Sequence, residues 1–133
     1  TRQQREREFH DRWAGQVDPG ELDPRGMAAC PTTPETTYAL DALGTISGRR
    51  VLDLGCGYGE TSTWLALQGA SVDAVDISPA MIEVSRRLAA RLGVGDRITF
   101  HAAPGESLPF EDSRFDAAFG RLMAAALPSR FHV

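Results

Sequence analysis

The chain has 133 residues, a net charge of −4 and 42% hydrophobic residues, which suffices for one modest domain with its own core. The acidic balance argues against nucleic-acid binding through a basic surface, and no apolar run approaches membrane-spanning length. Two cysteines do not make a disulfide framework. The N-terminus is charged and unlike a signal peptide. This feature and the low cysteine count together predict a cytoplasmic protein with reduced thiols.

The N-terminal residues 3–16 predict a strongly charged helix. Phe9 and Trp13 are four residues apart, so they share one face of that helix. Two interpretations stay open: these rings anchor a solvated helix to the domain, or the helix is a lid over a ligand site. His10 would reach a ligand only as part of a lid.

A proline- and glycine-rich stretch, residues 17–34, is expected to form a loop. A helix is then predicted between Thr33 as N-cap and Gly44 as stop. The chain therefore divides into an N-terminal helical and loop segment, residues 1–46, and a domain, residues 47–133.

The domain alternates apolar strands with amphipathic helices, which predicts an α/β fold with a parallel sheet and right-handed crossovers. The expected strands are residues 51–54, 71–75, 98–102 and 115–119, and the expected crossover helices are residues 61–68 and 79–92.

The most informative stretch, residues 51–59, reads VLDLGCGYG: an apolar strand runs into a glycine-rich turn that opens a helix. Glycines let the backbone approach a ligand where a Cβ would collide. The helix start presents unpaired N–H groups and a positive dipole end, which favour an anionic ligand group. Asp76 ends the next strand about 20 residues past the first glycine, where a carboxylate can bind ribose hydroxyls. Together these features predict a nucleotide pocket.

The glycine spacing narrows the choice of nucleotide. A nicotinamide or flavin fingerprint, G-x-G-x-x-G, would place its third glycine at position 60, where this chain has Glu60. The third glycine is Gly59 instead, so the pattern is G-x-G-x-G. No G-K-[ST] follows, which argues against a phosphate-binding P-loop.

The G-x-G-x-G turn after Val-Leu-Asp-Leu resembles motif I of the class I S-adenosylmethionine-dependent methyltransferases. In that family the turn lies under the methionine part of the cofactor, and the acid ending the second strand holds the ribose, which is Asp76 here. The resemblance implies that this part of the chain contacts the cofactor through Asp53, Gly55, Cys56, Gly57, Gly59, Asp76 and Ile77.

A second block strengthens the resemblance. Residues 103–110 read APGESLPF and precede a Phe-Asp pair, similar to the LPF…FD segment of small-molecule methyltransferases that include ubiquinone- and menaquinone-type enzymes. In that family the residues before Leu-Pro-Phe line the adenine, often with an Asp where this chain has Pro104. The resemblance therefore implies adenine recognition by Gly105 and Glu106.

The resemblance covers about residues 47–120 and implies a Rossmann-like, doubly wound parallel sheet with an N-terminal helical segment. The chain stops soon after its fourth strand. We therefore expect the C-terminal part of the sheet to be missing, in a fragment or a reduced natural form that holds the cofactor half.

The implied function is methyl transfer from S-adenosylmethionine to a small-molecule acceptor. A truncated cofactor-binding module without turnover is an alternative, and a nicotinamide-dependent oxidoreductase is a less favoured one. No metal is expected, because the three histidines lack ligand spacing. The catalytic residue, the acceptor and the oligomeric state are left open.

Several of these side chains also have structural interpretations. Asp53 could shape the glycine turn by bonding its backbone, whereas Asp76 has little structural reason beyond ribose binding. Asp73 could be a solvated charge at a strand end. His101, within a strand, and Asp116, before a strand, are expected to be structural.

Overall fold

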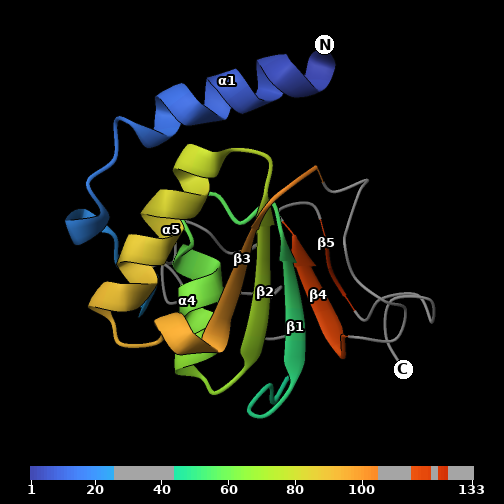
Figure 1. Cartoon of the computed structure of the whole chain (residues 1–133). Helices are drawn as coiled ribbons and strands as arrows, with labels where there is room; N and C mark the ends of the chain where they lie inside the picture. Colours follow the sequence, from blue (N-terminus) through green and yellow to red (C-terminus); the bar gives the residue numbers. More distant parts are fainter. Residues whose placement is uncertain (26–43, 105–114, 121–122, 126–133) are drawn as a thin grey trace.

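The computed structural model describes residues 1–25, 44–104, 115–120 and 123–125 (Figure 1). Within them a five-stranded sheet has the order β3-β2-β1-β4-β5. The strands are β1 (Arg50–Leu54), β2 (Ser71–Asp76), β3 (Ile98–Ala102), β4 (Ala117–Gly120) and β5 (Met123–Ala125). The first four are parallel, which confirms the predicted Rossmann-like arrangement. β5 pairs antiparallel with β4 and was not predicted, because Met-Ala-Ala carries no β-branched or aromatic signal.

The helices α4 (Glu60–Leu67) and α5 (Pro79–Arg91) both cover one face of the sheet (Figure 1). Val51 and Leu52 are neighbours in the central strand and point to opposite faces, yet they are only 0% and 1% exposed. The strand is thus buried on both faces, as its nearly continuous apolar run predicts. The helix expected after Thr33 lies outside the described residues.

Local signals define α5. The Ser78 side chain accepts a hydrogen bond from the Met81 N–H at 3.1 Å, and Pro79 occupies the first helical position. The buried face of the helix carries Met81, Ile82, Val84, Ser85, Leu88 and Ala89.

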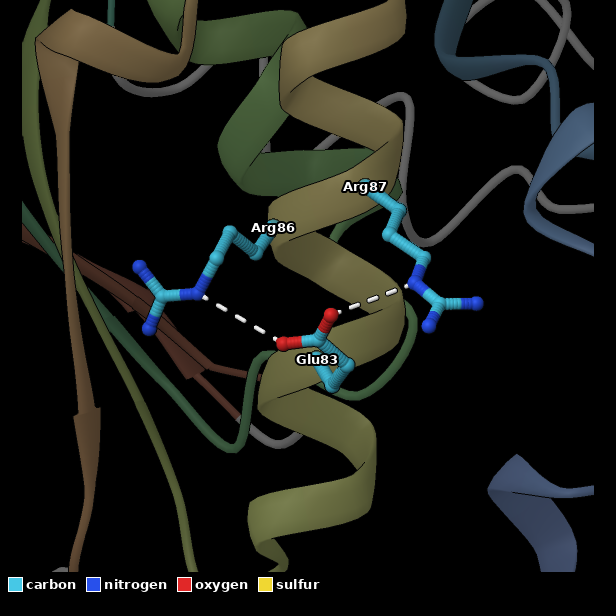
Figure 2. Close-up of polar contacts among 3 residues, drawn as sticks. All are labelled: Glu83, Arg86 and Arg87. Carbon is cyan, nitrogen blue, oxygen red and sulfur yellow. Dashed lines mark hydrogen bonds and ion pairs between the residues drawn. The ribbon is translucent and has the colours of Figure 1, made fainter.

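The outer face of α5 carries an exposed ion-pair cluster. Figure 2 shows Glu83 between Arg86 and Arg87, with nitrogen–oxygen distances of 3.7 and 3.1 Å. Exposed pairs of this kind contribute little to stability. The position of α5 is therefore set by its buried face.

The N-terminal helix α1 (Arg2–Ala14) lies at the end of the molecule where the parallel strands end and α5 begins (Figure 1). Its last residue, Ala14, packs with Met81 and Val84 of α5. Trp13 packs against the same cluster, whereas Phe9 touches the Trp13 ring and stays 55% exposed. Trp13 is therefore the anchor of the predicted aromatic pair.

Polar contacts hold α1 against the start of α5. Arg7 Nε donates to the Ile77 carbonyl oxygen at 3.3 Å. Asp11 Oδ1 accepts hydrogen bonds from the Ser78 hydroxyl and, at 3.4 Å, from the Ala80 N–H. The Asp11 carboxylate thus caps α5 from another helix, where the positive dipole end favours a negative charge.

Two acids, one within the sheet and one just before β4, are structural. Asp73 is only 7% exposed, and its Oδ1 lies 2.9 Å from His101 Nε2 on the neighbouring strand. The expectation of a solvated Asp73 is therefore wrong, while His101 is structural as predicted. Asp116 Oδ2 accepts from the Arg50 N–H at 2.9 Å, which ties the entry of β4 to the start of β1.

Replacing Asp11 with alanine removes the acceptor for Ser78 and Ala80 and the negative charge at the start of α5. We expect the free energy of unfolding to fall by about 1 kcal/mol, measured by urea denaturation. Glu8→Ala, at an exposed position of the same helix, is the control and should change stability much less. Equal losses for both variants would contradict the capping role of Asp11.

Candidate cofactor site

The glycine turn, defined here as residues 55–59, connects β1 to α4. Gly55 and Gly57 have φ values of +69° and +55°, in the left-handed region that favours glycine. A Cβ built on either would have no atom of the described residues within 4 Å. The turn therefore presents bare backbone to open space, which is a suitable cradle for a ligand.

Hydrogen bonds fix this turn to the end of β2. The N–H groups of Gly55 and Cys56 both donate to the Val75 carbonyl oxygen, at 2.8 and 2.9 Å. The Gly57 N–H donates to Asp76 Oδ2 at 3.0 Å. The cradle is thus held in shape by the strand that ends on the predicted ribose carboxylate.

Asp76 is 6% exposed, and its second oxygen, Oδ1, accepts from the Ser78 N–H at 2.9 Å. Its carboxylate therefore joins the turn to the start of α5, so the expectation that Asp76 has little structural reason is wrong. A carboxylate oxygen can accept more than one hydrogen bond. Ribose binding by Asp76 stays a prediction alongside this structural role.

Asp53 is 2% exposed, and its Oδ2 accepts from the Ser62 hydroxyl at 2.5 Å. The expected bond to the turn is thus replaced by one to the first turn of α4. Burial raises the pKa of Asp53 to about 7; the hydrogen bond from Ser62 opposes this effect, and the nearby charge of Asp76 adds to it. The protonation of Asp53 therefore changes near neutral pH.

Cys56 lies within the glycine turn, and Ile77 directly follows the end of β2. Cys56 is a free thiol, 8% exposed, and its Sγ lies 3.8 Å from the Ser85 hydroxyl. Burial raises the pKa of the Cys56 thiol well above its usual range, so it stays protonated and is a poor nucleophile. Ile77 offers its carbonyl, which accepts from Arg7.

The predicted adenine contacts, Gly105 and Glu106, lie outside the described residues. The segment that leads to them begins beside the site, because the Ala103 N–H donates to the Asp76 carbonyl oxygen at 2.9 Å.

The N-terminal helix reaches the rim of the glycine turn. The Tyr58 ring packs edge-on against Trp13, with centroids 5.7 Å apart. His10 stacks on Trp13, and its buried Nδ1 has no hydrogen-bond partner among the described residues. α1 therefore lies where a lid would, although the lid role and a ligand contact by His10 stay predictions.

Sequence reasoning missed three polar contacts of the site. Ser62 bonds Asp53, and Ser85 donates to the Gly57 carbonyl oxygen at 2.7 Å. Glu60 is half-buried and lies near Asp23; burial raises the pKa of Glu60, and a hydrogen bond from the Asp23 backbone opposes that effect. For Ser85, the available signal was a hydroxyl on a helix face that is otherwise apolar.

This arrangement combines bare backbone with two buried carboxylates at one end of a parallel sheet. Carboxylates can accept hydrogen bonds from vicinal hydroxyls and attract a cation. Among the described residues no group of three His, Cys, Asp or Glu side chains could hold a metal ion. No described helix is both long and apolar enough to cross a bilayer.

Comparison with known proteins agrees with this geometry. Residues 51–130 match the family model described as a methyltransferase domain. The methyltransferase GfsG of Streptomyces halstedii is 33% identical over 117 residues, covering 87% of this chain and 41% of the relative. A demethylmenaquinone methyltransferase of Clavibacter sepedonicus is 46% identical over 76 residues, covering 57% of this chain and 30% of the relative.

Solved structures show the same likeness. A geranyl diphosphate methyltransferase, determined in complex with SAM, superposes with a TM-score of 0.61 at 26% identity, covering 66% of this chain and 36% of that one. This chain spans less than half the length of the two curated relatives. The glycine turn and its strand open the matched region, and the chain belongs to the methyltransferase domain family.

Proposed function

We propose that this chain binds S-adenosylmethionine at the glycine turn and serves methyl transfer to a small-molecule acceptor. The observation that carries the proposal is the bare backbone at Gly55 and Gly57, held beside the carboxylates of Asp53 and Asp76. The relatives named as methyltransferases support it.

In this proposal the methionine part of the cofactor lies against the glycine turn. Asp76 accepts hydrogen bonds from the ribose hydroxyls, and Asp53 acts on the cofactor's ammonium group indirectly through its charge. Gly105 and Glu106 recognise the adenine. The proposed binding set is therefore Asp53, Gly55, Cys56, Gly57, Gly59, Asp76, Ile77, Gly105 and Glu106.

S-adenosylmethionine supplies a methyl group on a sulfonium, which leaves as a neutral thioether after an in-line displacement. The protein has to orient the acceptor behind the methyl carbon and exclude water. A base is needed only where the acceptor carries a proton of high pKa. In this proposal the described residues bind and orient the cofactor.

Two finer statements belong to the same proposal. Residues 1–46 form the N-terminal segment and residues 47–133 the cofactor-binding part, joined by the contacts of α1 with α5. We also place the protein in the cytoplasm, since the buried Cys56 is a free thiol.

Calorimetric titration with S-adenosylhomocysteine, the product of methyl transfer, and separately with NADH tests this function. We expect S-adenosylhomocysteine to bind and NADH to give no heat of binding. Binding of NADH alone would reject the proposal. If the chain binds S-adenosylmethionine but does not convert it to S-adenosylhomocysteine with any of the acceptors offered, it is the binding module instead.

A pair of glycine substitutions tests the cradle. Gly57→Ala and Gly93→Ala both place a Cβ at a positive φ in open space, so each carries a similar backbone strain of about 1–2 kcal/mol. Only Gly57 faces the proposed ligand. We expect a loss of affinity for S-adenosylhomocysteine of roughly tenfold or more in Gly57→Ala, about 1.4 kcal/mol, and none in Gly93→Ala. Equal affinities in the two variants would reject close backbone approach at Gly57.

The pKa of Asp53 predicts a pH dependence of binding. An ionised carboxylate favours a ligand that carries an ammonium group, and protonation of Asp53 below about pH 7 removes this attraction. We expect affinity for S-adenosylhomocysteine to rise roughly threefold to tenfold from pH 6 to pH 8, measured by calorimetry.

Asp53→Asn is the control for this titration, because an amide oxygen still accepts from Ser62 without titrating. Asp76 and Cys56, the neighbouring titratable groups, are unchanged in that variant. A pH profile that is as steep in Asp53→Asn as in the unaltered chain would assign the effect to another group.

A further inference from the structure

Ser85 is a buried hydroxyl on a helix face that is otherwise apolar. It lies on α5 at 0% exposure, with Ile82, Leu88 and Ala89 on the same buried face. A serine inside a helix commonly bonds the carbonyl one turn earlier, and a buried hydroxyl needs a partner. Ser85 finds its partner outside its own helix.

The Ser85 hydroxyl donates to the Gly57 carbonyl oxygen at 2.7 Å, across 28 residues of sequence. The Gly57 N–H donates to Asp76 Oδ2 at 3.0 Å. Gly57 is therefore held at both of its backbone polar groups, by side chains from α5 and β2. The same residue faces open space, where the cofactor is proposed to lie.

The turn also packs directly on the α5 backbone at this point. A Cβ built on Gly59 would lie 2.6 Å from the Cβ and Oγ of Ser85 and 2.8 Å from its Cα. Such distances are far below van der Waals contact, so Gly59 has to be a glycine for steric reasons. The close contact between Gly59 and Ser85 thus fixes the distance of the Ser85 hydroxyl from the glycine turn.

We propose that Ser85 is a positioning residue of the cofactor site, which orients the Gly57 peptide so that the bare face of the turn points at the ligand. This inference rests on the proposed binding of S-adenosylmethionine. Without the hydroxyl, the Gly57 carbonyl keeps only a long contact with the Cys56 thiol, 3.9 Å from Sγ to oxygen, and a thiol is a weak donor. A glycine peptide can adopt many backbone conformations once its strong partner is lost. The turn then has to be ordered during binding, which weakens affinity.

The test compares Ser85→Ala with Ala89→Gly, one helical turn further along α5. Ala89→Gly destabilises the helix and leaves the Ser85–Gly57 hydrogen bond in place, so it reports the effect of lost stability alone. Calorimetry with S-adenosylhomocysteine is run at a temperature where circular dichroism shows both variants folded. We expect the Kd of Ser85→Ala to rise roughly tenfold, as for a part-buried acceptor that loses its main hydrogen bond, and that of Ala89→Gly to change less than twofold.

A spectroscopic readout separates positioning from general destabilisation. The Tyr58 amide nitrogen shares a peptide with the Gly57 carbonyl, so its ¹⁵N chemical shift reports the hydrogen bond from Ser85. We expect this shift to move in ligand-free Ser85→Ala and to stay in place in Ala89→Gly. If Ser85→Ala does not fold, Ser85→Cys takes its place, because a thiol is a much weaker donor.

The outcomes distinguish this inference from the function on which it rests. If the unaltered chain does not bind S-adenosylhomocysteine, the proposed function fails. If the unaltered chain binds and the serine variant binds equally well, or loses no more affinity than Ala89→Gly, the positioning role of Ser85 is overturned while the function stands.

Discussion

The carboxylate of Asp76 holds together the segments that form the site. One oxygen accepts from the Gly57 N–H in the glycine turn, and the other accepts from the Ser78 N–H at the start of α5. Ser78 donates in turn to Asp11, so the N-terminal helix is joined to the same group. Because Asp76 ends a buried strand, its position is set by the sheet, and the surrounding turn, helix start and N-terminal helix take their positions from it.

Burial of two acids at one end of the sheet has an electrostatic consequence. Asp53 and Asp76 are both nearly inaccessible, and the charge of Asp76 adds to the burial that raises the pKa of Asp53. Asp76 is stabilised by two backbone N–H donors, whereas Asp53 has its hydrogen bonds from Ser62. A ligand with an ammonium group and vicinal hydroxyls would suit both acids. Its cation would favour the ionised form of Asp53, and its hydroxyls could donate hydrogen bonds to Asp76.

The sequence predicted those parts of the structure that local signals encode. Periodicity predicted the helix over residues 79–92 and the strand over residues 98–102, and the structure has α5 at Pro79–Arg91 and β3 at Ile98–Ala102. Contacts that depend on strand register could not be predicted. Asp73 meets His101 only because β2 and β3 pair in one particular register, and the sequence alone does not contain that register. The Ser85–Gly57 hydrogen bond likewise exists only once α5 lies beside the turn.

The three glycines of the motif answer to different constraints. Gly55 and Gly57 have open space where a Cβ would be, so they leave room for a ligand. Gly59 has no such space, because a Cβ there would collide with Ser85 of α5. The third glycine of this chain is at position 59, one residue earlier than in a dinucleotide fingerprint. Its position therefore reflects where α5 touches the turn. The G-x-G-x-G pattern therefore meets two separate requirements. Gly55 and Gly57 allow the close approach of the proposed cofactor, and Gly59 allows the close approach of α5.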